Sequence, residues 1–334
     1  MENYEVKQLA WNGMYKGQRL QGTLIETNIS WVILSGRVAF KIKKDIQFSF
    51  LDYSTLSKRK FFCERELELN GRFSSIYLSV EPIRYFQGHW HIGEGPGKIS
   101  DYAVRMKRLR ASKKMDVMLE KGEVALEDIQ ELAKLVADFH QRSALVFPVF
   151  DLEKEKALFN DLATVKAIAN KELGAGLPEK IDAAMERSNA FLELHKKRMA
   201  ARIRETWYRD THGDLHTGNI FLYRKPILFD CIEFNDSFRQ TDLLYELAFL
   251  CMDLEFYGRK DHSEALLRTY RKKIDPFVQD ADWQIFHYYK ALRANVRAKV
   301  NFLTAQSDRE AGAKLSDVKK AKGYLELMFE YLEI

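Results

Sequence analysis

The sequence predicts an α+β protein of two lobes, with an antiparallel, β-rich first lobe that contains one helix and a mainly α-helical second lobe. The chain has 334 residues, which exceeds one average domain. Up to about residue 105, β-branched and aromatic residues alternate around glycine turns, a pattern typical of hairpins. Beyond residue 110, apolar residues recur at spacings of three and four, which is typical of helices. We therefore expect lobes at 1–105 and 111–334, joined by a hinge at 106–110.

Hairpins and one helix are predicted for the first lobe. A glycine turn at 35–37 separates two runs of β-branched and aromatic residues, and Lys41 falls out of the apolar alternation of the second run. A serine and a threonine at 54–55 offer an N-cap for a helix. We expect strands at 21–27, 29–34, 38–42, 78–85 and 102–106, a helix at 54–73, and a glycine-rich loop at 88–97.

Helical periodicity dominates the second lobe. Apolar residues from Leu126 to His140 mark its first helix. A short strand-like stretch at 220–229 interrupts the helical pattern. We expect further helices at 151–171, 178–206, 241–257, 262–273, 283–305 and 310–332.

Composition and charge favour a globular protein without a nucleic-acid partner. Lys and Arg number 53 and Asp and Glu number 48, which gives a net charge of +5, and 46% of the residues are hydrophobic. This balance excludes disordered and fibrous proteins. Because acidic residues are spread among the basic ones, we expect no basic face of the kind that binds nucleic acid.

The cysteines and the N-terminal segment indicate a reducing compartment. Cys63, Cys231 and Cys251 are far apart and lack a Cys-x-x-Cys spacing, so we expect neither a disulfide framework nor a structural zinc site. The N-terminal segment contains Glu2 and Glu5 and lacks the apolar core of a signal peptide. No apolar run long enough for a membrane span follows. We therefore expect a cytoplasmic protein with no membrane contact.

The most specific motif is the string THGDLHTGNI at 211–220, followed by an apolar run that ends at Asp230. Phosphoryl transfer needs one carboxylate to accept or orient the proton of the attacking hydroxyl group, and an amide and a second carboxylate to hold magnesium ions. Asp214, Asn219 and Asp230 supply these groups. A surface turn is the alternative, because it uses the same residue types. The full string with its terminal aspartate favours the catalytic interpretation.

The two histidines of this string have different expected roles. His212 is expected to brace the loop by hydrogen bonding rather than to perform chemistry. For His216, support of the loop and contact with a substrate are both open.

This string resembles the aminoglycoside phosphotransferase and choline kinase branch of the protein-kinase-like fold. The strings ETNISWV at 26–32, AFKIKK at 39–44, DYAVRM at 101–106 and LFDCIEFN at 228–235 are similar to a bacterial group of uncharacterised phosphotransferase-like proteins, often fused to a P-loop kinase domain. The resemblance covers residues 20–305 and implies a nucleotide-binding first lobe and a catalytic, substrate-binding second lobe. The sequence contains no Gly-x-x-x-x-Gly-Lys-Ser/Thr motif, so a two-step activity of the fused forms is not expected.

The resemblance implies that Lys41 contacts the α and β phosphates of a nucleotide. Its partner in this fold is a glutamate on the following helix. Glu64, Glu66 and Glu68 are the candidates, and we select Glu66 because it precedes the apolar Leu67. The alternatives are an exposed lysine on a strand and a solvated face of glutamates on a helix.

Other nucleotide contacts are also implied by the resemblance. No Gly-x-Gly-x-x-Gly loop is present, so the turn at 27–30 would contact phosphates through backbone N–H groups and the hydroxyls of Thr27 and Ser30. The adenine ring would stack on apolar side chains and bond to the backbone of the hinge, at Met106, Lys107 and Leu109. Met106 in a plain core position is compatible with the same pattern.

The second lobe is expected to bind a small molecule. Only residues 231–241 separate Asp230 from Asp242, which leaves little room for the peptide platform of a protein kinase. A long helical stretch between His140 and His212 fits a small-molecule pocket instead. Glu233 and Asp236 are expected to bond to hydroxyl or amine groups of the acceptor, and Arg239 is expected to form a structural pair with Asp242.

A basic stripe marks the helix predicted at 283–305. Lys290, Arg293 and Arg297 share one side of it, because they are three and seven positions apart. One interpretation is a solvated face. The other is a site for an anionic group of the substrate, such as a carboxylate or phosphate, at Arg293 and Arg297.

Together these patterns predict a phosphotransferase that uses Mg-ATP or Mg-GTP and a small hydroxyl acceptor. Asp214 would be the catalytic residue, Asn219 and Asp230 would hold Mg²⁺, and Lys41 with Glu66 would orient the phosphates. A protein-directed kinase and a non-catalytic nucleotide-sensing module are the alternatives. The identity of the acceptor and the oligomeric state stay open.

Overall fold

The computed structural model describes residues 1–174, 176–306 and 311–334. These residues form two compact units. The first unit contains residues 1–117, 219–223 and 227–238, and the second contains residues 118–218, 224–226 and 239–334. The strand pair that follows the THGDLHTGNI string therefore belongs to the first unit. The hinge at 106–110 stays a prediction.

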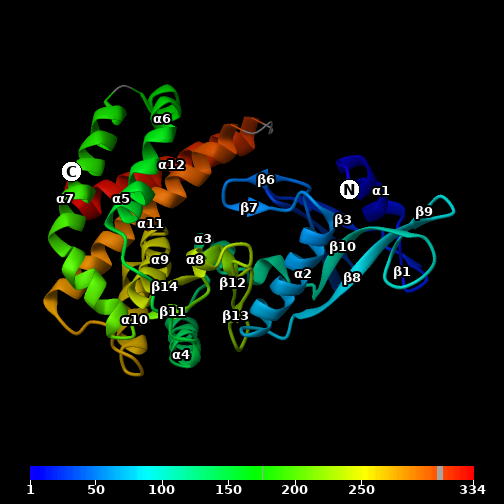
Figure 1. The fold of residues 1–334 in the computed structure, drawn as a ribbon, viewed down its shortest axis with the longest axis horizontal. Helices are drawn as coiled ribbons and strands as arrows, with labels where there is room; N and C mark the ends of the chain where they lie inside the picture. The colour runs from blue at the N-terminus through cyan, green and yellow to red at the C-terminus, as the bar shows by residue number, and fades with distance from the viewer. Residues whose placement is uncertain (175, 307–310) are drawn as a thin grey trace. The chain divides into compact units, whose positions relative to one another are not determined.

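Within the described residues, an eight-stranded sheet forms the centre of the first unit (Figure 1). Its strands are β1 (Met14–Tyr15), β2 (Gln18–Arg19), β3 (Thr23–Glu26), β4 (Ser30–Ser35), β5 (Val38–Lys43), β8 (Tyr77–Phe86), β9 (His89–Ile92) and β10 (Lys98–Lys107). They follow the order β2-β1-β9-β8-β10-β5-β4-β3, and neighbours are antiparallel except β1 and β9. The unit also contains β6 (Gln47–Phe48), β7 (Leu51–Asp52), β12 (Ile220–Phe221), β13 (Ile227–Leu228), α1 (Asn3–Asn12) and α2 (Leu56–Gly71). The predicted α+β class with an antiparallel first lobe is confirmed.

Side-chain alternation along β5 gives its two faces different roles. Phe40 and Ile42 belong to a core that includes residues of α1. Ala39 lies on the opposite face, in a second core that includes residues of α2. Because successive side chains of a strand point to opposite faces, Lys41 and Lys43 share the face of Ala39 and meet α2.

Helix α1 and strand β9 are absent from the sequence prediction. The buried residues of α1, namely Val6, Leu9 and Ala10, form one stripe on a short helix, which is a weak helical pattern. β9 lies in the segment predicted to be a glycine-rich loop. Gln87 and Gly88 both have positive φ, which is the two-residue turn that returns a strand on its neighbour. A short hairpin therefore occupies part of the predicted loop.

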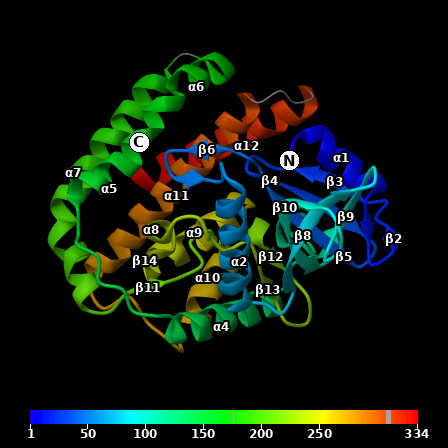
Figure 2. The same cartoon turned by 45° about the vertical axis from the view of Figure 1, so that its right-hand side comes forward.

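Helices build the second unit, and α11 and α12 pack side by side in it (Figure 2). Helix α9 is buried along almost its whole length. The helices are α4 (Leu126–Arg142), α5 (Leu152–Asn160), α6 (Lys166–Leu173), α7 (Leu177–Arg204), α9 (Leu243–Phe256), α10 (Lys260–Tyr270), α11 (Asp280–Gln306) and α12 (Ala311–Leu332); β11 (Tyr208–Asp210) pairs with β14 (Gln240–Asp242). The second unit also contains the short helix η2 (Asp161–Val165), whereas η1 (Ala111–Lys113) belongs to the first unit. The short helices α3 (Met115–Glu120), η3 (Thr217–Asn219) and α8 (Asp236–Arg239) have residues in both units. No helix among the described residues is long and apolar enough to cross a membrane.

The single helix predicted at 151–171 is wrong. The structure divides it into α5, η2 and α6. The hydroxyl of Thr164 donates a hydrogen bond of 2.7 Å to the carbonyl oxygen of Asp161. Such a bond competes with the helical hydrogen bonds, and the adjacent β-branched Val165 further disfavours a regular α-helix. The tighter turn of η2 results.

The contact of α12 with α9 makes Gly323 sensitive to substitution. A Cβ atom at Gly323 would lie 2.8 Å from the ring of Phe256, and that ring is stacked on Tyr324 with 3.9 Å between centroids. We expect Gly323→Ala to lower the free energy of unfolding by about 1–3 kcal/mol because the ring has to move. Gly312→Ala is the matched control in the same helix, since a Cβ atom there meets nothing within 4 Å.

Helix propensity alone should make Gly312→Ala stabilising by up to about 1 kcal/mol. Urea unfolding of both variants measures the two effects. Equal stability changes in the two variants would contradict tight packing at Gly323.

Candidate functional site

Lys41 on β5 forms two ion pairs in the first unit. Its Nζ atom lies 2.9 Å from Oε1 of Glu66 on α2 and 2.5 Å from Oδ1 of Asp230. Glu66 is completely buried, whereas Glu64 lies at the surface and pairs with Lys60. Glu66 is therefore the partner of Lys41, as the sequence prediction selected.

Both members of this pair are ionised at neutral pH. Burial would raise the pKa of Glu66, but Lys41 and Lys43 outweigh burial and lower that pKa to about 2. Burial would likewise lower the pKa of Lys41, yet Asp230 and Glu66 raise it well above its usual value. The first unit therefore holds a fixed positive charge beside a carboxylate.

Lys43, two residues further along β5, extends this pair into a buried network. Its Nζ atom lies 2.7 Å from Oε2 of Glu66 and also bonds to Glu233. The Glu233 carboxylate accepts a hydrogen bond of 2.6 Å from the hydroxyl of Tyr53. We call Lys41, Lys43, Glu66, Asp230 and Glu233 the lysine–carboxylate network. The burial of Glu233 favours a structural role over the acceptor contact predicted for it.

The backbone at Asp230 is held by side chains from β8 and α2. Asp230 has a φ of +63°, a region that residues other than glycine seldom use. Its N–H donates to the hydroxyl oxygen of Tyr77 at 2.9 Å, and the next N–H, of Cys231, donates to Oδ1 of Asn70 at 2.8 Å. No sequence pattern marks Tyr77 or Asn70, because only the tertiary fold brings them to a segment more than a hundred residues away.

Asn219 and Asp230 are close neighbours in the first unit. Strands β12 and β13 pair Ile220 with Leu228, and the N–H of Phe229 donates to the carbonyl oxygen of Asn219 at 3.2 Å. The Asp230 side chain is 43% exposed in spite of its contact with Lys41. Mg²⁺ prefers oxygen ligands and is commonly held by one or two carboxylates together with phosphate oxygens. The amide of Asn219 and the carboxylate of Asp230 fit this chemistry.

The turn between β3 and β4 is closed by its own side chains. The N–H of Ser30 donates to Oγ1 of Thr27 at 3.0 Å, and the two hydroxyl oxygens lie 3.1 Å apart. Ser30 is buried and Thr27 is exposed. A phosphate bound here would compete with the bond between the two hydroxyls, and the phosphate contacts of both residues stay a prediction.

Side chains at the predicted hinge join an apolar cluster of the first unit. Met106 belongs to its buried core, and Leu109 packs against that core. Ala39 of β5 and Phe229, which precedes Asp230, also belong to this cluster. Lys107 is exposed. Met106 and Leu109 of the hinge segment therefore share a cluster with Ala39, which is close to Lys41 in the sequence, and with Phe229, which precedes Asp230.

Two backbone amides of the hinge segment are already engaged. The N–H of Lys107 donates to the carbonyl oxygen of Ile76 at 2.8 Å. The N–H of Arg108 donates to the carbonyl oxygen of Arg37 at 2.9 Å. A nucleotide base at this hinge would therefore have to bond to carbonyl oxygens or to the N–H of Leu109.

In the second unit, a buried carboxylate anchors the start of the THGDLHTGNI loop. Glu246 of α9 accepts hydrogen bonds from the N–H groups of His212 and Gly213, at 2.9 and 2.8 Å. Its Oε1 atom also lies 3.3 Å from Nε2 of His140, whose Nδ1 atom lies 2.8 Å from the hydroxyl of Tyr270. Burial would raise the pKa of Glu246, but His140 outweighs burial and lowers it to about 2.

The two histidines of the loop support Asp214. Nδ1 of His212 accepts a hydrogen bond of 3.3 Å from the N–H of Asp214, which confirms its predicted bracing role. Nδ1 of His216 accepts from the N–H of Gly218 at 3.0 Å, so Nε2 carries the ring proton when the imidazole is neutral. This Nε2 atom lies 3.5 Å from Oδ2 of Asp214. His216 is buried and its ring packs at a tilt against that of Phe249, with 5.2 Å between centroids, which favours support of the loop.

Asp214 stays ionised over the whole physiological range. Burial would raise its pKa, but His216 and, more weakly, Arg293 and Arg297 outweigh burial and hold the pKa well below its ordinary value. The Asp214 side chain is nevertheless 38% exposed. The loop therefore presents an accessible carboxylate whose charge is balanced by cationic groups of the same unit.

Comparison with known proteins decides the family. Residues 83–284 match the model of the phosphotransferase enzyme family. The chain belongs to this family. The match covers the end of the β-sheet, the THGDLHTGNI loop and most of the helices of the second unit.

Curated relatives of this chain come from mycobacteria. Uncharacterised proteins of Mycobacterium tuberculosis and Mycobacterium bovis are 32% identical to it over 296 residues, which is 86% of this chain. The aligned part is 56% of each relative, so the chain spans about half the length of the curated relatives it matches.

Solved structures share the fold of this chain at low identity. A choline kinase of Cryptosporidium parvum has a TM-score of 0.55 and 12% identity, with 99% of this chain and 97% of that chain covered. The GDP and kanamycin complex of APH(2")-IIIa has a TM-score of 0.53 and 12% identity, with coverage of 98% and 99%. A choline/ethanolamine kinase family protein of Mesorhizobium loti has a TM-score of 0.51 and 14% identity, with 98% of both chains covered. The predicted kinase-like fold is confirmed.

Arg239 and Asp236 have other partners in the structure than the sequence predicted. The predicted pair of Arg239 with Asp242 is wrong, because Nε of Arg239 donates to Asp210 at 2.7 Å and Asp242 forms hydrogen bonds of 2.6 and 2.9 Å with Arg202. The spacing of Arg239 and Asp242 did not reveal that β11 and α7 supply closer partners. Asp236 bonds to Arg65, and its predicted contact with an acceptor stays a prediction.

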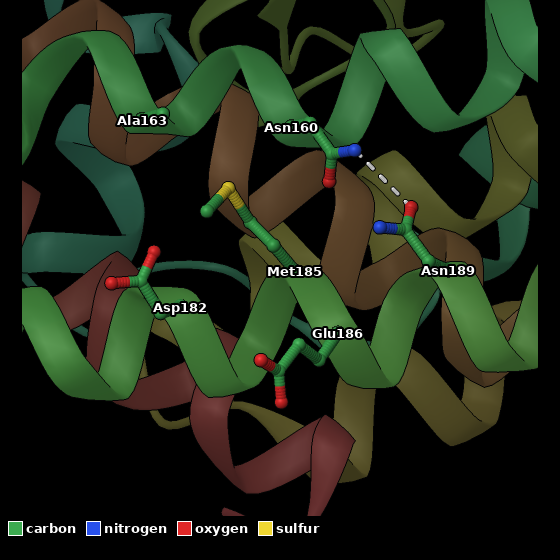
Figure 3. Close-up of a pocket in the computed structure, with 6 residues that line it drawn as sticks. All are labelled: Asn160, Ala163, Asp182, Met185, Glu186 and Asn189. Carbon is green, nitrogen blue, oxygen red and sulfur yellow. Dashed lines mark hydrogen bonds between the residues drawn. The ribbon is translucent and has the colours of Figure 1, made fainter.

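A cavity of about 350 Å³ lies in the long helical stretch of the second unit (Figure 3). It is lined by side chains of α5, η2 and α7, namely Asn160, Ala163, Asp182, Met185, Glu186 and Asn189. Nδ2 of Asn160 donates to Oδ1 of Asn189 at 3.2 Å across it. None of the predicted site residues lines this cavity.

Because the ionised carboxylate of Glu246 anchors the loop, the contribution of Glu246 to the free energy of unfolding depends on pH. The folded-state pKa is about 2 and the ordinary value is 4.5, so the contribution is present above pH 4.5 and is lost as the pH falls towards 2. This difference corresponds to about 3 kcal/mol. We expect Glu246→Gln to lower the free energy of unfolding by about 2–3 kcal/mol at pH 7, and by progressively less below pH 4.5.

Urea unfolding at a series of pH values measures this change. Glu264→Gln, an exposed position on α10, is the control and should have little effect at any pH. A stability deficit of Glu246→Gln that is the same at pH 3 and pH 7 would contradict the role of the ionised carboxylate.

Proposed function

We propose that this phosphotransferase is a small-molecule kinase that transfers the γ-phosphoryl group of Mg-ATP or Mg-GTP to a hydroxyl group. The observation that carries this proposal is Lys41, whose Nζ atom lies 2.9 Å from Glu66 and 2.5 Å from Asp230. Nucleotide phosphates need a fixed cation next to a carboxylate that can hold a metal. Family membership and the GDP in a similar solved structure support a nucleotide as the donor.

The residues of the first unit would bind the donor. Lys41 would contact phosphate oxygens, with its position set by Glu66. Asn219 and Asp230 would hold Mg²⁺, which when bound neutralises negative charge on the phosphates. The apolar cluster around Met106 and Leu109 would take the nucleotide base.

Asp214 would act on the acceptor. The acceptor oxygen forms a bond to the γ-phosphorus, the bond from that phosphorus to the nucleoside diphosphate breaks, and the hydroxyl proton passes to the carboxylate of Asp214. Because the pKa of Asp214 lies well below its ordinary value, this carboxylate is always ionised and available to orient the hydroxyl group. Its weak basicity means that the proton arrives late in the transfer. His216 would keep the carboxylate oriented.

A small molecule is the expected acceptor. Similar solved structures are named for choline kinase and for a complex with kanamycin, both of which concern small molecules. Only residues 231–241 lie between Asp230 and Asp242, and a peptide platform needs a longer segment. These two observations favour a metabolite over a protein as the acceptor.

Mass spectrometry of a metabolite extract tests this proposal. The purified chain is incubated with Mg-ATP or Mg-GTP and the fractionated extract, and a compound that gains one phosphoryl group is the expected result. Asp214→Asn runs in parallel and should abolish the gain. Phosphorylated polypeptides in place of metabolites would favour a protein kinase, and nucleotide binding without transfer would favour a sensing module. Absence of nucleotide binding would overturn the proposal.

A further inference from the structure

Arg293 and Arg297 lie one turn apart on α11, in the same unit as the loop that carries Asp214. Arg293 is only 6% exposed, and its Nη2 atom donates to the carbonyl oxygen of Gly213 at 2.7 Å. Its guanidinium carbon lies 3.9 Å from the ring centroid of Tyr245 and 4.2 Å from that of Phe249. These contacts fix the Arg293 guanidinium next to the residue that precedes Asp214.

Neither arginine has the partner that a buried cation usually has. Among the described residues, neither forms an ion pair with a carboxylate, and the Nε atom of each is buried without a hydrogen-bond partner. Buried charges in proteins are normally paired, because removing a charge from water is costly. Lys290 on the same helix follows this rule, since it lies 2.9 Å from Glu255.

Nearby carboxylates act on the arginines through space but, among the described residues, form no ion pair with them. Asp253 accepts hydrogen bonds from the N–H of Thr217 at 2.8 Å and from the hydroxyl of Tyr324 at 2.6 Å. Burial would lower the pKa of Arg297, but Tyr324, Asp253 and Asp214 raise it well above its usual value. The second unit therefore holds two guanidinium groups beside its catalytic loop, each with a buried Nε donor that no described protein group uses.

We propose that Arg293 and Arg297 form an anion subsite that binds a carboxylate or phosphate group of the acceptor. This proposal rests on the proposed function and narrows its substrate class to hydroxy acids and hydroxylated phosphate esters. A guanidinium group donates paired N–H bonds that match both kinds of anion. An acceptor with an amine at the same position would be repelled by the two arginines. The similar structures are named for choline kinase and for a complex with kanamycin, and both of these small molecules carry amino or ammonium groups, so this subsite would separate the present chain from those proteins.

The γ-phosphate of the nucleotide is the other possible source of an anion at this place. Arg297 can distinguish the two sources, because it is partly exposed and open to chemical modification. Phenylglyoxal modifies arginine side chains, and peptide mass spectrometry measures the rate at Arg297 itself. Arg187, an exposed arginine on α7, serves as the internal control.

The probes are inorganic phosphate and malonate at constant ionic strength, each in the absence and presence of saturating Mg-AMP-PNP. With Mg-AMP-PNP bound, we expect each anion to slow the modification of Arg297 by about tenfold. The rate of modification of Arg187 should not change. Complete protection by Mg-AMP-PNP alone would overturn the proposal, because the arginines would then serve the donor. No protection by any probe would also overturn it.

Steady-state kinetics gives a second test. Hydroxy compounds of matched size are compared as acceptors, one with a carboxylate, one neutral and one with an amine. Arg297→Met should raise KM for the anionic acceptor by about tenfold to a hundredfold, which corresponds to loss of a charge-assisted hydrogen bond. The KM for the neutral acceptor should change by less than about twofold, because that acceptor carries no anionic group. Lys299→Met removes a charge from the same helix at a residue bonded to Asp161, and should leave KM unchanged.

The two proposals can fail separately. If phosphate and malonate protect Arg297 but no compound is phosphorylated, the anion subsite stands and the kinase function fails. If phosphorylation occurs and Arg297→Met raises KM for the neutral acceptor as strongly as for the anionic acceptor, the kinase function stands and the acceptor subsite fails. Arg293→Lys keeps the charge but loses the paired donors, and should resemble Arg297→Met rather than the wild type.

Discussion

Asp214→Asn is expected to lower kcat by about 10² to 10⁴ while the affinity for Mg-nucleotide is retained. The amide cannot accept the hydroxyl proton, but it fills the same space in the loop. The hydrogen bonds that hold the loop stay in place, because neither of them uses the Asp214 carboxylate. Nδ1 of His212 accepts from the backbone N–H of Asp214, and the N–H of Gly218 donates to Nδ1 of His216. A thermal shift with Mg-nucleotide measures binding, and initial rates with the acceptor found by mass spectrometry measure kcat.

Asp138→Asn is the matched control for this variant. Asp138 undergoes the same chemical change in the same unit, on α4, where it is exposed and bonds to Lys273. It should leave kcat unchanged. A rate for Asp214→Asn within a factor of two of the wild type would refute the role of this carboxylate. A loss of nucleotide binding together with activity would show instead that the substitution damages the loop.

Local patterns in the sequence were sufficient to place Lys41 on a strand and Glu66 on a helix, whereas the pairing of the two was implied by the family resemblance. Lys41 interrupts the apolar alternation of its strand, and the structure places it on the face opposite Phe40 and Ile42. Glu66 was selected because it precedes Leu67 in the helix that follows. Periodicities of two and of three to four indicate which side chains share a face, so the elements themselves could be predicted without the tertiary fold.

Contacts between distant segments could not be read in the same way. Tyr77 and Asn70 hold the backbone at 230–231, and Glu246 holds the amides of His212 and Gly213. Each of these side chains occurs in an ordinary helix or strand sequence, and its role follows only from its partner. The same reason explains the incorrect pairing of Arg239, since a sequence spacing of three does not exclude a closer partner from another element.

Lys43→Met is expected to lower the free energy of unfolding by about 3–5 kcal/mol. Lys43 is 1% exposed, and it is the shared partner of Oε2 of Glu66 and of Glu233. Burial would lower its pKa, but Glu233 and Glu66 raise it well above the usual value, so the buried group is a cation. Methionine has a similar length and would leave two buried carboxylates with one lysine, Lys41, between them. Urea unfolding measures the loss.

Lys44→Met is the control for Lys43→Met, and a double variant tests whether Lys43 and Glu233 are coupled. Lys44 pairs with the exposed Glu26 at 2.6 Å, and removal of such a surface pair costs at most about 1 kcal/mol. Lys43→Met combined with Glu233→Gln removes the excess negative charge, so it should be more stable than Lys43→Met alone. A double variant that is less stable by the sum of both single changes would contradict a direct coupling of Lys43 and Glu233.

The Lys43→Met variant also tests whether Lys43 affects nucleotide binding in addition to stability. Glu66 has one oxygen on Lys41 and the other on Lys43, so loss of Lys43 frees Glu66 to bind Lys41 with both oxygens. Lys41 would then be held more tightly and would be less available to phosphate oxygens. We therefore expect Lys43→Met to raise KM for Mg-nucleotide even under conditions in which the variant is fully folded. An unchanged KM would mean that Lys43 stabilises the first unit without setting the position of Lys41.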